Sequence, residues 1–359
     1  MSKKKLTKKE QDTLWALINY PTLNDNALAK KTRLKLSTIT AIRRRLWERG
    51  FYRTVNIPNF FRLGYELFTV HYGTFNEAVP VEKRIKYFKN YIDGSPNIIF
   101  SMMGRANGIV LNVERNYAEA NEHYENLEMF FNSHHLTDEG GWKKAIFPFQ
   151  TAKFWNFFDF SPTVRYAYDI KRKINLPEFI SDKNKKVIRL SKKEKRVLRG
   201  LVKYPEDSDN SIADKTDVSR QAVSNIKKRF MSEHLLYVRR IMNFEHMGCN
   251  LIPFAYTYFG PMTPMEARKD GLDYTKRSVP IFLGISSNFE NIVFATTKNY
   301  PEYEKLREKL LSFYKTHLSI AKPPEALLFT VDDLCYCKNL TFADLLDDMF
   351  EREEEMSGP

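Results

Sequence analysis

The sequence contains an internal repeat. When it is shifted by 184 positions, residues 6–80 align with residues 190–264 without a gap, and 23 of the 75 aligned positions are identical. The identities include Tyr20-Pro21 on Tyr204-Pro205, and the match resumes further along at an offset of 183. A period of this length predicts duplicated domains rather than a solenoid of short repeats.

Length and composition predict a soluble protein with buried hydrophobic cores. The chain has 359 residues, of which 43% are hydrophobic, and no stretch approaches the roughly 18 consecutive apolar residues that a membrane helix needs. Its N-terminus lacks the apolar segment of a signal peptide. Three cysteines, with only one C-x-C pair, predict neither a disulfide framework nor a metal site. We therefore expect a cytoplasmic protein without a membrane partner.

The positive charge is concentrated in the repeated segments. The net charge is +13 overall, +10 in residues 1–53 and +6 in residues 190–240, with a further +5 in residues 161–189 and −7 in residues 329–359. This distribution favours a polyanionic partner. Solvated helix faces are the alternative explanation.

Each repeat begins with a pattern typical of a winged helix-turn-helix. Thr7 and Glu10 form a capping-box sequence at the start of the first helix. In the first repeat we expect helices at Leu6–Tyr20, from Asp25 or Asn26 to about Lys31, and from Ser37 as the cap to Gly50, then a β-hairpin wing at Phe51–Ile57. In the second we expect helices at Ser191–Tyr204, Asp209–Lys215 and Ser219–Ser232, and a wing at Leu236–Asn243.

The remainder of each repeat predicts a β-α-β-β-α-β order, which is that of a ferredoxin-like sheet domain. In the first repeat the elements are Tyr65–Phe75, Val81–Tyr91, Ile98–Met103, Ile109–Glu114, Tyr117–Ser133 and Lys144–Gln150. In the second they are Leu251–Phe259, Pro264–Asp270, Ile281–Ile285, Ile292–Thr296, Glu302–His317 and Ala326–Thr330.

The predicted fold class is therefore α+β, with two tandem copies of a winged helix-turn-helix followed by a ferredoxin-like domain. The expected boundaries are 1–58 and 59–160 for the first copy, 161–189 for a linker, 190–242 and 243–340 for the second copy, and 341–359 for an acidic tail. The tail combines carboxylates with apolar residues. It is either an amphipathic helix, docking on the basic segments or on transcription machinery, or a solvated tail.

The third helix of each copy carries the candidate DNA-binding residues. Short polar side chains at the front of such a helix reach base edges in the major groove, and cations nearer its end contact phosphates. The candidates, which include one wing arginine per copy, are Lys35, Ser37, Thr38, Thr40, Arg43, Arg44, Arg45 and Arg53 in the first copy, and Ser219, Arg220, Gln221, Ser224, Asn225, Lys227, Lys228 and Arg239 in the second.

The chain resembles the Lrp/AsnC (leucine-responsive) regulators of prokaryotes and archaea. The resemblance is carried by Asp25–Thr32, Ser37–Thr40, Arg45-Leu46, Gly50, Asn56–Asn59 and Leu63–Tyr65. It implies pairing through the sheet domains, paired winged helices on double-stranded DNA and a small-molecule effector. The family's aspartate is absent from the turns Gly104–Gly108 and Gly284–Asn291. The expected function is a sequence-selective transcription regulator acting as a covalent pseudo-dimer, with two recognition helices in successive major grooves and with homo-oligomers possible through the sheet domains.

Two other functions compete with this one. An architectural DNA-binding protein would show the same basic charge with little sequence preference. Siroheme decarboxylases share the two-part architecture, but the histidine expected near the second strand in that family is absent from Pro96–Gly108 and Val279–Asn291. No phosphate loop or nucleophile elbow is present either. The sequence therefore predicts no enzyme and no cofactor.

Overall fold

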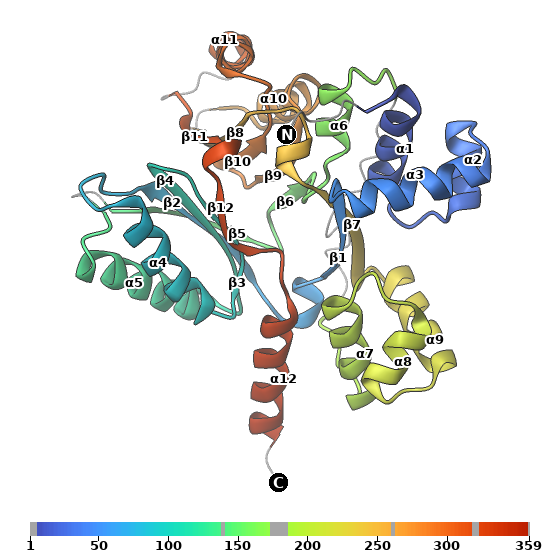
Figure 1. The fold of residues 1–359 in the computed structure, drawn as a ribbon. Coiled ribbons are helices and arrows are strands. Elements are labelled where there is room, and N and C mark those ends of the chain that lie inside the picture. Colours follow the sequence, from blue (N-terminus) through green and yellow to red (C-terminus); the bar gives the residue numbers. More distant parts are fainter. Residues whose placement is uncertain (1–5, 138–140, 173–185, 260–262, 318–322, 358–359) are drawn as a thin grey trace. The chain divides into compact units, whose positions relative to one another are not determined.

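The computed structural model describes residues 6–137, 141–172, 186–259, 263–317 and 323–357 (Figure 1). The chain is mixed α+β with antiparallel sheets, as expected at that level. It divides into two compact units, each built from three separate segments. The first unit comprises Met1–Thr54, Ala152–Phe179 and Val238–Asp332, and the second comprises Val55–Thr151, Ile180–Tyr237 and Asp333–Pro359.

Each unit holds one three-helix segment. The helices are α1 (Lys8–Asn19), α2 (Asp25–Thr32) and α3 (Leu36–Glu48) in the first unit, and α7 (Lys192–Lys203), α8 (Asp209–Thr216) and α9 (Arg220–Ser232) in the second. The capping box predicted from Thr7 and Glu10 is present, and Ser191 and Glu194 form the same box in α7. Both boxes satisfy backbone N–H groups that would otherwise lack partners at the helix start.

Helices α3 and α9 differ in their N-terminal capping, but the residues that follow their C-terminal ends share one backbone conformation. Ser37 does not cap α3 as predicted, because the helix begins at Leu36 and Lys35 occupies the N-cap without a side-chain bond. Ser219 does cap α9, accepting from the Ala222 N–H. After the helices, Gly50 (φ +67°) and His234 (φ +56°) adopt the same left-handed conformation. The absence of glycine in the second copy therefore does not change how the helix ends.

The predicted wings are not local hairpins. Each wing sequence forms a single strand, β1 (Tyr52–Pro58) or β7 (Leu236–Met242), and the two strands pair with each other in a two-stranded sheet. The sequence prediction was wrong here because alternation of apolar residues identifies a strand but not its partner.

The second unit contains a five-stranded sheet in the order β12-β3-β4-β2-β5. Its elements are β2 (Leu67–Thr74), α4 (Val81–Asp93), β3 (Ile98–Met103), β4 (Asn107–Glu114), α5 (Tyr117–Ser133), β5 (Lys143–Pro148) and β12 (Cys335–Asn339). Helices α4 and α5 cover one face (Figure 1). Phe88, Phe131 and Trp142 belong to the hydrophobic core of this unit.

The first unit contains a second sheet, in the order β11-β8-β10-β9-β6. Its elements are β6 (Lys153–Trp155), β8 (Leu251–Tyr258), α10 (Met265–Ser278), β9 (Ile281–Ser286), β10 (Glu290–Ala295), α11 (Tyr300–His317) and β11 (Glu325–Thr330). A short helix, α6 (Ser161–Ala167), lies in the segment expected to be a linker. Strand β6 follows β5 in sequence yet joins this sheet, whereas β12 follows β11 and joins the other.

The acidic C-terminal segment forms helix α12 (Ala343–Ser357) within the second unit. Leu345 and Leu346 are fully buried. Asp347 accepts hydrogen bonds from Arg199 of α7, and Glu353 pairs with Lys195, so the helix docks on a basic segment as one of the two alternatives anticipated. Three short 3-10 turns, Phe61–Leu63, Phe244–His246 and Val331–Asp333, complete the described elements.

Candidate functional site

The outward face of α3 is polar and exposed. Ser37, Thr40, Ala41 and Arg44 are all exposed, and their spacing of three and four residues places them on one stripe of the helix. Arg44 is the most exposed of the three consecutive arginines, with 78% of its side chain accessible and only a 3.6 Å surface pair to Glu48. Such an exposed ion pair contributes little to stability, so Glu48 would not prevent Arg44 from binding another anion.

The other two arginines of α3 are engaged inside the three-helix segment. Arg43 donates to Asp25 at the start of α2 over 2.8 Å, and Arg45 lies 2.9 Å from Glu10 of α1. These pairs tie the third helix to the first two. The predicted phosphate contacts of Arg43 and Arg45 therefore compete with contacts that build the segment itself.

Helix α9 repeats this arrangement at the positions offset by 184. Lys227 lies 3.0 Å from Asp209, and Arg229 lies 2.5 Å from Glu194. Lys228, which corresponds to Arg44, is exposed. In both helices, acidic residues of the first two helices bind the flanking cations and leave the central one facing outward.

The acidic partners are held in their charged forms. Burial raises the pKa of Asp25, but hydrogen bonds from Arg43 and Thr40 outweigh it, so the net pKa is lowered. Burial likewise raises the pKa of Glu10 and Glu194. The capping-box bonds and the nearby arginines lower the pKa of both below its ordinary value.

The remaining predicted residues fall into three groups. Arg220, Gln221 and Asn225 are exposed on α9, and Lys35 is exposed at the N-cap of α3. Ser219 is exposed although its hydroxyl caps α9. Thr38, Ser224 and Arg53 are half-buried. Arg239 is only 6% exposed and donates to the Phe157 carbonyl. The predicted contact of Arg239 with DNA therefore conflicts with its burial in the core of the first unit.

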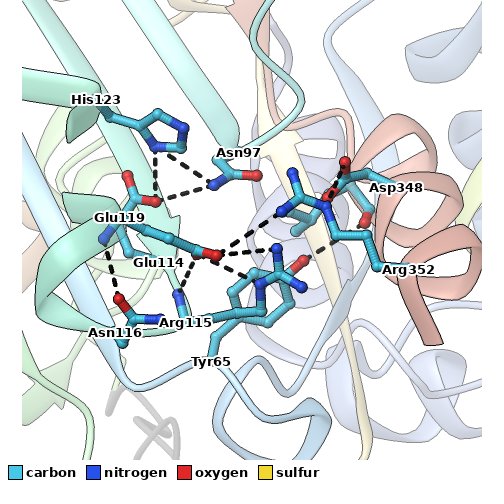
Figure 2. A network of polar contacts seen from close by, with 10 residues as sticks. Tyr65, Asn97, Glu114, Arg115, Asn116, Glu119, His123, Asp348 and Arg352 are labelled. Carbon is cyan, nitrogen blue, oxygen red and sulfur yellow. Dashed lines mark hydrogen bonds and ion pairs between the residues drawn. The ribbon is translucent and has the colours of Figure 1, made fainter. Parts of the chain in front are cut away.

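A second polar cluster, missed by sequence reasoning, lies on the helix-covered face of the sheet in the second unit (Figure 2). Glu114 at the end of β4 is fully buried, and its carboxylate accepts from Asn97 over 2.9 Å and contacts His123 Nδ1 over 2.8 Å. The hydrogen bond to Glu114 raises the pKa of His123, whose side chain is 32% exposed. A buried carboxylate behind an accessible imidazole is an arrangement that supports proton transfer.

The same figure shows where the C-terminal helix joins this domain. Arg115 and Glu119 pair over 2.9 Å, and Arg352 of α12 lies 3.7 Å from Glu119 and 2.9 Å from Asp348 (Figure 2). No sequence signal linked Glu114 to His123, since a lone glutamate at a strand end is ordinarily solvated. The packing of α5 against β4 brings the two side chains together.

No group of three or more His, Cys, Asp or Glu side chains among the described residues is placed to hold a metal ion. No helix in the described part of the chain is long and apolar enough to cross a membrane.

The comparisons with known proteins point to a fold. No protein-family model and no curated protein matches the sequence. The solved structure of the siroheme decarboxylase NirDL matches over 96% of this chain and 99% of its own, with 12% identity and a TM-score of 0.51. Its complex with an iron-uroporphyrin III analogue gives a TM-score of 0.52 at the same identity and coverage. An AsnC family transcriptional regulator from Agrobacterium tumefaciens matches over 40% of this chain and 90% of its own, with 16% identity and a TM-score of 0.32.

These matches correct one prediction. The sequence predicted that this protein is not an enzyme. The solved structure of NirDL, which resembles this fold over 96% of the chain, is that of an enzyme. The absence of histidine from Pro96–Gly108 and Val279–Asn291 therefore does not exclude an enzyme.

Proposed function

We propose that this protein binds double-stranded DNA through α3 and α9 and regulates transcription. The observation that carries the proposal is the repeated pattern of charge in the two helices. Arg43 and Arg45, like Lys227 and Arg229, are paired with acidic residues of their own segment, while Arg44 and Lys228 face outward. An outward-facing cation behind short polar side chains matches what a recognition helix presents to a major groove.

The finer organisation belongs to the same proposal. We infer two tandem copies of a winged helix-turn-helix and a ferredoxin-like domain. The gapless alignment of residues 6–80 with residues 190–264 and the matching strand orders β5-β2-β4-β3 and β11-β8-β10-β9 support this. The two reading helices differ at Ser37/Gln221 and Ala41/Asn225, which suits an asymmetric site read in successive major grooves.

Selection of bound duplexes from a random pool tests this function. The proposal predicts a recovered motif with two unlike half-sites, and the doubly substituted Arg44→Ala/Lys228→Ala protein should bind the motif at least tenfold more weakly. Recovery of no motif, with binding that still depends on these two cations, would favour the architectural alternative. Unchanged binding by the double variant would exclude α3 and α9 as the DNA-binding surface.

A second candidate function follows from the full-chain fold match. Tetrapyrrole binding by this protein is supported by the match to a siroheme decarboxylase over 96% of the chain. The pair of Glu114 and His123 would supply a proton-transfer group on the sheet domain of the second unit. A titration with siroheme, followed by its Soret absorption, tests binding, and analysis of the product tests decarboxylation. No spectral shift at a stoichiometric excess of protein would rule this function out.

A further inference from the structure

The first unit contains a cavity that the DNA-binding surface does not use. It has a volume of ≈ 80 Å³ and lies between the sheet of that unit and its helices α10 and α11. A buried water takes about 10–15 Å³ of such volume, so the cavity has room for a ring system. Its apolar lining carries a few polar atoms, and residues that line it include Ala255, Thr257, Asn291, Val293, Tyr314 and Pro324.

The corresponding space in the second unit is filled by an indole ring. Strand β5 pairs with β2 so that Lys143 lies opposite Tyr72, and β11 pairs with β8 so that Glu325 lies opposite Tyr256. Tyr72 and Tyr256 are aligned in the sequence repeat. Trp142, one residue before Lys143, therefore corresponds to Pro324, one residue before Glu325.

The residues beneath the indole also differ between the two units. Trp142 is 1% exposed and packs directly on Gly73 and Gly108, where an added Cβ would come within 2.6 Å and 2.5 Å of indole atoms. Gly73 and Gly108 are paired across β2 and β4, as Thr257 and Asn291 are across β8 and β10. The first unit therefore has Pro324 in place of Trp142 and carries larger polar residues, Thr257 and Asn291, on the strands below.

Two buried polar atoms in the cavity lack a hydrogen-bond partner among the residues that the structure describes. Asn291 is 4% exposed and Thr297 is 1% exposed, and both line the cavity. Among the described residues, Asn291 Oδ1 and Thr297 Oγ1 have no hydrogen-bond partner. An unsatisfied buried acceptor costs free energy comparable to a lost hydrogen bond, which a ligand that donates to it would recover.

We propose that this cavity binds a small planar aromatic molecule of about the size of indole that bears an N–H donor. The apolar walls receive the ring, as the walls around Trp142 do in the second unit. Asn291 Oδ1 accepts from the N–H group, an interaction for which Gly108 offers no side chain. The proposal is independent of DNA or tetrapyrrole binding, because it concerns the interior of one sheet domain.

Calorimetric titration of the full-length protein with indole tests the site. We expect one molecule bound per chain with a dissociation constant of about 1 mM or tighter, since a ligand of this size in an apolar pocket reaches that range. Ala255→Leu on β8 and Ala295→Leu on β10 narrow the cavity from two strands, and each should weaken binding at least tenfold. Ala255→Gly keeps the space open and serves as the matched control.

The hydrogen bond has its own test. Benzofuran has the shape of indole without the N–H group, and it should bind several-fold more weakly to the wild-type protein. Asn291→Ala should abolish this difference between the two ligands. Circular dichroism confirms that each variant is folded. The proposal is overturned if indole fails to bind the wild-type protein at millimolar concentration, or if folded leucine variants bind it as tightly as the wild type.

Discussion

Arg43 donates a hydrogen bond to Asp25 across 2.8 Å and so fixes the third helix of its segment to the start of the second. Lys227 and Asp209 repeat the relationship over 3.0 Å at positions shifted by 184. A cation in the middle of a recognition helix is ordinarily assigned to phosphate binding. Here the neighbouring cation, Arg44 or Lys228, is the one that faces solvent.

The first prediction separates these two roles by stability. Arg43→Ala leaves Asp25 without its main partner and should lower the free energy of unfolding by about 1 kcal/mol. Arg44→Ala removes an exposed side chain and should change it by less than about 0.5 kcal/mol. Urea unfolding at pH 7 measures both. Equal losses in the two variants would contradict the assignment of Arg43 to an internal contact.

The second prediction concerns the stability of the protein at low pH. Because the folded-state pKa values of Asp25, Glu10 and Glu194 are lowered, the unfolded chain binds more protons near pH 4, and stability falls as the pH drops through that region. The stabilisation is fully present above the ordinary carboxyl pKa values. Unfolding in urea at pH 7, 5, 4 and 3 should show the loss.

A double variant and a matched control identify which carboxyl groups cause the loss of stability in acid. The double variant Glu10→Gln/Glu194→Gln should be less stable at pH 7 and should lose less stability on acidification, because two of the responsible carboxyls no longer titrate. Glu48→Gln, at an exposed position, is the control and should follow the wild type. If the double variant and the control respond identically to acid, the capping-box glutamates are not the source.

The third prediction concerns His123. Its hydrogen bond to Glu114 raises its pKa above the ordinary value, so the stabilisation from this pair is fully present below about pH 6.5 and is lost as the pH rises through the folded-state pKa. Titration of the imidazole signals by NMR should place the pKa of His123 above the ordinary histidine value. Glu114→Gln should shift the His123 pKa downward, and an unchanged titration curve would contradict the contact.

The fourth prediction tests the docking of α12. Leu346 is fully buried, and Leu346→Ala should lower the free energy of unfolding by about 2–5 kcal/mol. Glu355→Ala, on an exposed part of the same helix, should change it by less than about 0.5 kcal/mol. Denaturant unfolding gives both values. A solvated C-terminal segment would instead make the two substitutions equally mild.

Local sequence signals predicted much of the fold. The capping boxes at Thr7 and Ser191 set the starts of α1 and α7, and the strand Ile98–Met103 and the helix Tyr117–Ser133 were predicted with the bounds observed. These features depend on residues that are neighbours in the chain. The sequence therefore contains their cause directly.

Features that depend on distant partners were not predictable in the same way. Strand β1 looked like one arm of a hairpin but pairs with β7, and β6 and β12 each join a sheet whose other strands come from the opposite half of the sequence. The same limit applies to the candidate sites. Arg239 was assigned to DNA from its place in a wing, although its guanidinium is buried against the Phe157 carbonyl.

The most direct test of the DNA-binding proposal is the salt dependence of binding to a labelled duplex, measured by fluorescence anisotropy. Arg44→Ala and Lys228→Ala should each weaken binding and reduce the slope of log K against log salt by about one unit, because each variant removes one phosphate contact. The paired position Lys227→Ala should reduce the slope by less, since Lys227 is held by Asp209. Equal slopes for the wild type and the Arg44→Ala/Lys228→Ala protein would contradict the account.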